Sequence, residues 1–190
     1  MIIPIGEWIL REACRTAAML PGDIHMAVNL SPIQLRHSSL VNVVRSALEE
    51  TGLPAGRLEL EVTESVFLEA TPTTQSILRR LRELGVGLSL DDFGIGYSSL
   101  SYLRRRAFNK IKVDSAFVRD LPSERGDIAI VRAIVDIASA LGMTVTAEGV
   151  ESEEQCLLLR QFGCHQLQGY LFSKPISAEK VIESSKRLAA

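Results

Sequence analysis

The stretch HMAVNLS, residues 25–31, alternates apolar and polar side chains and decides between two kinds of α/β fold. Met26, Val28 and Leu30 would share one face of a strand, and Asn29 would lie on the opposite face, because successive strand residues point to opposite sides. The first face is apolar throughout, whereas the second ends in polar groups. This stretch therefore predicts a strand with a buried apolar side and a polar carboxyl end.

The same pattern recurs in five more segments along the chain. We predict strands over residues 25–31, 58–64, 86–91, 110–114, 144–149 and 165–171. Apolar residues at helical spacing predict helices over 6–19, 33–50, 72–84, 98–104, 127–141, 152–162 and 177–189. Strands separated by one helix run parallel, so the expected order is a helix followed by six βα units.

The polar faces favour a barrel over a doubly wound sheet. A doubly wound sheet buries both faces under helices, whereas a barrel can gather polar residues from many strands at one interior mouth. The polar residues expected there, one from each successive strand, are Asn29, Glu61, Asp91, Lys112, Glu148 and Gln168. Each alone is more simply explained as a hydrogen-bonded buried group or a helix cap. Six in succession indicate a functional site.

Composition is consistent with one compact domain covering residues 1–190, since 46% of the residues are hydrophobic and 23% are charged. A net charge of -2 disfavours a DNA-binding surface, so a nucleotide would be bound in a pocket. The three cysteines have no metal-type spacing, which predicts reduced, buried thiols and a cytoplasmic location. No apolar run has membrane-spanning length.

The predicted site is rich in carboxylates and contains no histidine or cysteine. Glu61, Asp91 and Glu148, with Asp92 adjacent and an amide oxygen from Asn29, form a hard oxygen donor set. Such a set suits Mg2+ or Mn2+ and argues against structural zinc. Two ions are expected, because the adjacent aspartates can supply one bridging and one terminal carboxylate.

Lys112 and Gln168 supply the remaining chemistry. Lys112 could hold a nucleophilic water or stabilise charge on a phosphoryl oxygen, and Gln168 could orient that water. The implied reaction is hydrolysis of a phosphate ester. The alternative for Lys112 is a simple internal ion pair with Asp114 or Glu148.

Two other segments have unusual composition: one is rich in glycine and the other in arginine. Gly94 and Gly96 make the loop after the third strand suitable as a lid or a phosphate cradle, although their spacing alone is a weak signal. The arginines at 104–106 are most simply a solvated helix end, and we place no site there.

The ordered motifs resemble those of EAL domains, a family of cyclic-di-GMP-specific phosphodiesterases. They are NLS at 29–31, EVTE at 61–64, DDFG at 91–94, KVD at 112–114, AEGVE at 147–151 and QGYLF at 168–172. The opening IPIGEW at 3–8 also resembles the family's first barrel helix, so the resemblance spans nearly the whole chain. It implies a TIM-like (β/α)8 barrel that hydrolyses one phosphodiester of cyclic di-GMP to give pGpG.

The resemblance also implies a role for each matching residue. Asn29, Glu61 and Asp91 would bind one ion, and Asp91, Asp92 and Glu148 would bind the second. Lys112 and Gln168 would act on the attacking water, with Asp92 beside them. The residues expected to support the site are Glu64, which would brace the lid loop, Glu151 and Asp114.

The sequence departs from the family in three places. Ile95 stands where threonine is usual, and residues 107–109 read AFN where the family has proline, phenylalanine and aspartate. The two strands that carry the EAL motif, with its metal-binding glutamate and phosphate-binding arginine, should precede Met1. We therefore expect an N-terminally truncated domain with six of eight strands and little activity.

Three functions stay open at this stage. The first is a metal-dependent phosphodiesterase, in a longer protein fused to an upstream sensor or GGDEF domain. The second is a non-catalytic degenerate module that binds cyclic di-GMP or a protein partner, including a second copy in a homodimer. The third is an inert fragment.

Overall fold

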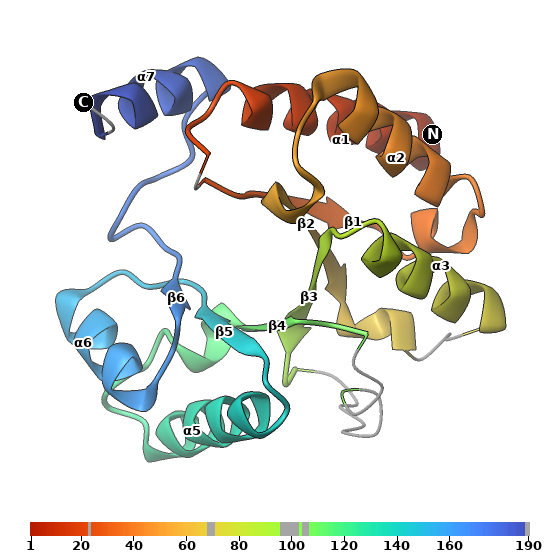
Figure 1. Ribbon diagram of the computed structural model, residues 1–190. Helices are drawn as coiled ribbons and strands as arrows, with labels where there is room; N and C mark the ends of the chain where they lie inside the picture. Colours follow the sequence, from red (N-terminus) through yellow and green to blue (C-terminus); the bar gives the residue numbers. More distant parts are fainter. Residues whose placement is uncertain (23, 68–70, 96–102, 104–106, 189–190) are drawn as a thin grey trace. The chain divides into compact units, whose positions relative to one another are not determined.

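The computed structural model of the chain describes residues 1–22, 24–67, 71–95, 103 and 107–188 (Figure 1). It divides into two compact units. The first comprises Met1–Leu88 with Ile176–Ala190, and the second comprises Ser89–Pro175. No helix in the described ranges is both long enough and apolar enough to cross a membrane.

Within the described residues, six strands follow one another in chain order, as the alternating pattern predicts. They are β1 (Met26–Leu30), β2 (Leu58–Thr63), β3 (Gly87–Phe93), β4 (Lys110–Val113), β5 (Thr144–Ala147) and β6 (Gln166–Leu167). β1 pairs with β2, and the chain from β3 to β6 pairs strand by strand, in each case in parallel. The predicted parallel α/β organisation is confirmed.

In the first unit, helices enclose an apolar layer on β1 and β2. The helices are α1 (Ile2–Ala18), α2 (Leu40–Thr51), α3 (Pro72–Glu83) and α7 (Ala178–Leu188). α1 packs on α2 and β1, and α2 packs on α3. Leu10, Val44 and Leu60 are completely buried, so burial of apolar surface holds these elements together.

The predicted helix over 33–50 is wrong in its first part. Gln34–Arg36 form a 3-10 turn, and the helix begins only at Leu40. The Ser31 N–H donates to Gln34 Oε1 at 3.1 Å, and the Gln34 N–H donates to Ser31 Oγ at 3.4 Å. These local side-chain bonds compete with helix formation directly after β1.

Arg57 fastens the segment between α1 and β1. Its Nη2 group donates to the carbonyls of Ala17 at 2.8 Å, Leu20 at 3.2 Å and Pro21 at 2.9 Å, and Nε donates to Ile24 at 2.9 Å. The carbonyls of Ala17 and Pro21 also accept the backbone N–H groups of Leu20 and Ile24, both at 3.1 Å, so the guanidinium adds a second hydrogen bond to each. It also donates to the carbonyls of Leu20 and Ile24. One side chain thus fixes how the chain enters β1.

We predict that Arg57→Ala lowers the free energy of unfolding by about 2 kcal/mol, because it removes the charge-assisted hydrogen bonds to the carbonyls of Ala17, Leu20, Pro21 and Ile24. Arg57→Lys should recover only part of this, since an ammonium lacks the planar fork. Urea unfolding followed by circular dichroism measures the effect. Arg15→Ala is the control, because the Arg15–Glu12 pair is exposed. Equal effects of Arg15→Ala and Arg57→Ala would contradict this account of Arg57.

In the second unit, α5 (Arg125–Ala140) and α6 (Glu153–Phe162) pack on each other, and α5 packs on β4 and β5. Ile111, Val113 and Val145 are completely buried beneath them. The two helices begin and end within two residues of their predicted ranges. The predicted helix over 98–104 lies, apart from Leu103, outside the described residues.

β6 is much shorter than the predicted strand over 165–171. After Leu167 the chain bonds to the loop that follows β5, since the Val150 N–H donates to Gln168 O and the Leu171 N–H donates to Val150 O, both at 3.0 Å. Gly169 lies so close to the Val150 backbone that a Cβ would not fit. The alternating pattern therefore predicts where this strand begins, but it does not predict that the chain leaves the strand after Leu167.

Candidate metal centre

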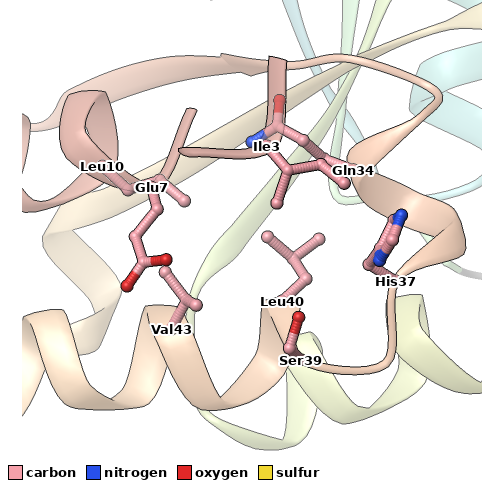
Figure 2. A pocket seen from close by; sticks show the side chains of 8 residues that line it. All are labelled: Ile3, Glu7, Leu10, Gln34, His37, Ser39, Leu40 and Val43. Carbon is pink, nitrogen blue, oxygen red and sulfur yellow. The ribbon is translucent and has the colours of Figure 1, made fainter. Parts of the chain in front are cut away.

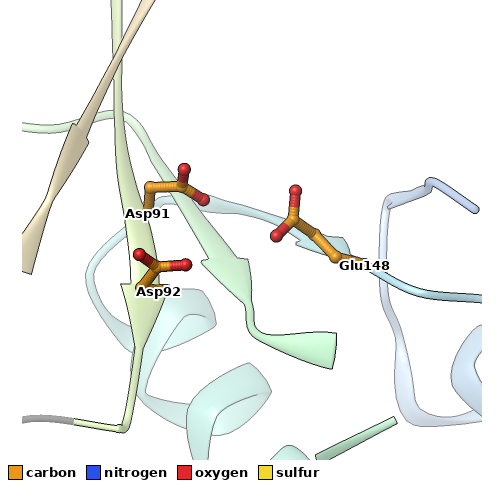
Figure 3. Close-up of side chains that lie close together, drawn as sticks. All are labelled: Asp91, Asp92 and Glu148. Atoms are coloured by element: carbon orange, nitrogen blue, oxygen red, sulfur yellow. The ribbon is translucent and has the colours of Figure 1, made fainter. Parts of the chain in front are cut away.

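Two adjacent aspartates at the end of β3 point to the same side. In a regular strand their side chains would point to opposite faces. Here the register of β3 on β4 shifts between Leu90 and Phe93, and Asp92 has a left-handed backbone with φ 54°. Aspartate is one of the few residues that tolerate this conformation. The irregularity turns the carboxylates of Asp91 and Asp92 toward Glu148 (Figure 3).

Glu148, directly after β5, completes a group of three carboxylates. One oxygen from each of Asp91, Asp92 and Glu148 lies within 4.8 Å of the others. Asp91 is buried and Glu148 is half-buried, and Asp92 is the most exposed of the three. Carboxylates this close repel one another unless positive charge lies between them.

Lys112 on β4 supplies that positive charge. Its ammonium Nζ lies 2.7 Å from Glu148 Oε1 and 3.1 Å from Asp91 Oδ1, and its side chain is only 5% exposed. The internal ion pair with Glu148, one of the alternatives for Lys112, is therefore present. Because the same ammonium also reaches Asp91, it joins the ends of β3 and β5 through β4.

The carboxyl group of Asp92 has a raised pKa. Burial raises the pKa of Asp92, the charges of Asp91 and Asp114 and a hydrogen bond with Asp114 raise it further, and Lys112 lowers it. Asp114 also caps the 3-10 turn after β4, where its Oδ1 accepts the Ala116 N–H at 2.6 Å. Because burial and the neighbouring negative charges both disfavour the charged form of Asp92, a cation beside it would be stabilised.

Backbone contacts interlock the loops after β4, β5 and β6. The Glu148 N–H donates to Val113 O at 3.1 Å, and the Gln168 N–H donates to Ala147 O at 2.9 Å. Gly149 has φ 71°, and a Cβ on it would lie 2.6 Å from Ser115 Cβ, so only glycine allows this approach. Glu148 is therefore held from both neighbouring loops. The side chains of Gln168 and Glu151 are exposed.

The first unit holds the other predicted ligands. Asn29 on β1 lies directly opposite Glu61 on β2, and Glu61 is 6% exposed, whereas Asn29 is exposed. Glu64, just after β2, is 9% exposed, and neither of its carboxylate oxygens has a hydrogen-bond partner within the part of the chain that is described. A buried carboxylate without a partner is costly, so Glu64 is well placed to receive a donor or a cation.

Other predicted features fall at the limit of the structure. Gly94 has φ 102° and packs against Phe117, and Ile95 is 59% exposed. Gly96, the loop residues 97–99 and the arginines at 104–106 lie outside the described residues.

A small pocket lies elsewhere in the first unit, between α1, the 3-10 turn and α2 (Figure 2). Its lining is Ile3, Glu7, Leu10, Gln34, His37, Ser39, Leu40 and Val43. None of these is a predicted site residue. The Glu7 carboxylate in this lining forms an ion pair with Arg11 at 3.1 Å. The pocket is therefore separate from the predicted carboxylate site.

The donor set in the second unit fits a hard divalent cation. Its carboxylate oxygens are the ligands preferred by Mg2+, Mn2+ and Ca2+, and the group includes no histidine or cysteine. Over residues 1–175 the sequence matches the model of the EAL domain. The chain belongs to the EAL domain family.

Two curated relatives of the chain have named activities. The chain is 44% identical over 188 residues to the bifunctional diguanylate cyclase/cyclic di-GMP phosphodiesterase MucR of Pseudomonas aeruginosa, covering 97% of this chain and 27% of MucR. It is 47% identical over 180 residues to the cyclic di-GMP phosphodiesterase NbdA of the same species, covering 93% of this chain and 23% of NbdA. The chain thus spans about a quarter of the length of these relatives.

Solved EAL structures have the same fold. The MucR phosphodiesterase in complex with c-di-GMP matches with a TM-score of 0.89 and 43% identity, covering 95% of this chain and 74% of that one. Klebsiella pneumoniae BlrP1, in a manganese/cy-diGMP complex, matches with a TM-score of 0.84 and 36% identity, covering 91% of this chain and 45% of BlrP1. The predicted fold is confirmed: an incomplete EAL-type (β/α)8 barrel with six strands.

We predict that Asp92→Asn stabilises the metal-free protein at neutral pH, by up to about 1 kcal/mol for a partly exposed group. The raised pKa of Asp92 means that the folded state binds its proton more tightly than the unfolded state. The contribution of Asp92 to stability therefore falls as the pH rises through the pKa of its carboxyl group in the folded state. Asparagine cannot ionise, so the variant does not lose this stability. The gain should vanish at a pH below the ordinary pKa of aspartate.

Thermal unfolding at several pH values measures this effect. Asp136→Asn on the exposed face of α5 is the matched control and should change stability little. Mn2+ should raise the melting temperature of the unchanged chain more than that of Asp92→Asn. A destabilising Asp92→Asn at neutral pH without metal would contradict a raised pKa of Asp92.

Proposed function

We propose that the chain supplies the catalytic residues of a cyclic-di-GMP phosphodiesterase domain, which hydrolyses one phosphodiester of the substrate to give pGpG. The observation that carries this proposal is the position of Lys112, with Nζ 2.7 Å from Glu148 and 3.1 Å from Asp91, beside three carboxylates within 4.8 Å of one another. The named activities of MucR and NbdA support the choice of substrate.

Asp91, Asp92 and Glu148 would hold one cation. Asn29 and Glu61, which lie opposite each other on β1 and β2, are proposed as further metal ligands. Support comes from the carboxyl-end position of each residue on parallel strands and from BlrP1 complexes that contain calcium or manganese with cy-diGMP. We propose Mg2+ or Mn2+ as the physiological ion. When bound, such an ion would lower the pKa of a water and offset phosphate charge.

The protein's own groups would orient the reactants. Lys112 is buried and paired with two carboxylates, so its ammonium is held in place and can direct an N–H toward the water or a phosphoryl oxygen. Gln168 follows β6 with an exposed amide, which could accept a hydrogen bond from the attacking water. Asp92 would also hold that water, and Asp114, whose side chain is hydrogen-bonded to Asp92, would orient it. Glu64 is proposed as a supporting residue, because its carboxylate is buried.

In a longer protein, this domain would be joined to a sensor or a diguanylate cyclase domain, as the bifunctional description of MucR suggests. The competing possibility is a module that binds cyclic di-GMP without hydrolysing it. Both possibilities make the same prediction for nucleotide binding, and only turnover separates them.

The test uses the chain alone and a fusion that adds the first two βα units of the MucR EAL domain at the N-terminus. The fusion should convert cyclic di-GMP to pGpG with Mg2+, measured by liquid chromatography. Asp91→Ala or Lys112→Ala in the fusion should lower kcat by at least about a hundredfold, because the first removes a metal ligand and the second removes the ammonium proposed to act on the water or the phosphoryl oxygen. Binding measured in Ca2+ should change far less.

Lys110→Ala is the matched control, because Lys110 is two residues earlier on β4 and donates to Gln166 at 2.7 Å. It should keep near-normal turnover. A fusion that binds cyclic di-GMP but never hydrolyses it would favour the binding module. Near-normal turnover in Asp91→Ala or Lys112→Ala would show that the assigned role is wrong.

A further inference from the structure

Gln155, in the first turn of α6, uses its whole side-chain amide to join two loops. Its Oε1 accepts the N–H groups of Glu151 at 2.8 Å and Ser152 at 3.1 Å. Its Nε2 donates to the carbonyls of Val118 and Arg119, both at 3.1 Å. A glutamine amide has two donors and an acceptor oxygen with two lone pairs, so its hydrogen-bonding capacity is completely used.

One of these loops carries Glu148 of the metal centre, and the other begins at Asp114, which is hydrogen-bonded to Asp92. Glu151 and Ser152 end the loop that begins with Glu148, and Val118 and Arg119 follow the turn that Asp114 caps after β4. Lys112 lies at the end of the same strand. Between the two connections, Gly149 packs against Ser115. Gln155 therefore links the same two loops a second time, through hydrogen bonds, beyond the contact of Gly149 with Ser115.

Gln155 is only 6% exposed, so water cannot replace bonds that a substitution removes. We propose that Gln155 is a positioning residue, which sets the location of Glu148 relative to Lys112 and thereby the metal affinity of the site. This inference rests on the proposed function. Gln155 itself touches neither the three carboxylates nor Lys112 in any contact found in the described residues.

Gln155→Glu separates the two sets of hydrogen bonds. A glutamate of the same shape keeps the acceptor that caps Glu151 and Ser152 but loses both donors to Val118 and Arg119. The cap of α6 would remain while the link to the loop after β4 is cut. Ser152→Ala is the matched control, because it removes the Oγ that accepts the Gln155 N–H at 3.2 Å but leaves the Gln155 amide in place.

Two measurements on the full chain test the proposal. Hydrogen exchange by NMR compares the Glu148 N–H, which donates to Val113 O, with the Thr144 N–H, which donates to Asn109 O at the other end of β5. Titration with Mn2+ alone, followed by electron paramagnetic resonance, gives the dissociation constant. Removing a residue that orients metal ligands typically weakens metal binding by about ten- to a hundredfold.

In Gln155→Glu, we expect exchange at Glu148 to rise about tenfold relative to Thr144, and the Mn2+ dissociation constant to rise about tenfold. Ser152→Ala should lower the melting temperature. It should change neither the exchange rate of Glu148 relative to Thr144 nor the Mn2+ dissociation constant by more than about twofold. Gln155→Asn, one methylene shorter and unable to span both loops, replaces Gln155→Glu if the latter does not fold.

The proposal is overturned if the Glu148 and Thr144 amides accelerate together, or if Ser152→Ala weakens Mn2+ binding as much as Gln155→Glu does. If the unchanged chain binds no Mn2+, the proposed function fails. The exchange comparison then still decides whether Gln155 positions Glu148.

Discussion

Repulsion among closely spaced carboxylates is the constraint on which the site depends. Asp91, Asp92 and Glu148 bring negative charge to the ends of two strands that are not neighbours, and Lys112 lies on the strand between them. Its ammonium is what allows the acids to be held this close in a partly buried place. Burial raises the pKa of Asp92, and the charges of Asp91 and Asp114 raise it further, so a cation beside this carboxylate would be stabilised.

The remainder of the second unit holds these charges in register. Parallel pairing places the carboxyl ends of β3, β4 and β5 at one edge, and buried apolar residues such as Ile111 and Val145 fix the strands beneath α5. Glycines at 149 and 169 allow the loops to touch backbone to backbone. The apolar core therefore fixes the positions of the strands, while contacts of small residues fix the loops that follow them.

Alternation of apolar and polar residues was sufficient to predict the six strands and the residues at their ends. Asp92 was expected beside Asp91 because the two are adjacent in the sequence and match a family motif, but alternation does not explain it, since a strict two-residue period sends Asp92 to the other face. Only a register shift and a left-handed backbone bring it back. Periodicity also failed at 33–36, where Ser31 and Gln34 bond locally, and at the end of β6, where Gly169 packs on Val150. Gln155 was missed, although the sequence SEEQ at 152–155 has the form of a capping box.

The central claim is that the carboxylates around Lys112 form a divalent cation site. Crystals of the chain soaked in Mn2+ and measured at the manganese absorption edge test it directly by anomalous diffraction. The account predicts an anomalous peak within coordination distance of Asp91, Asp92 and Glu148, with Lys112 beside it. Absence of a peak there at saturating Mn2+, with the Lys112 pairs to Asp91 and Glu148 unchanged, would contradict it and leave the cluster a structural ion-pair network.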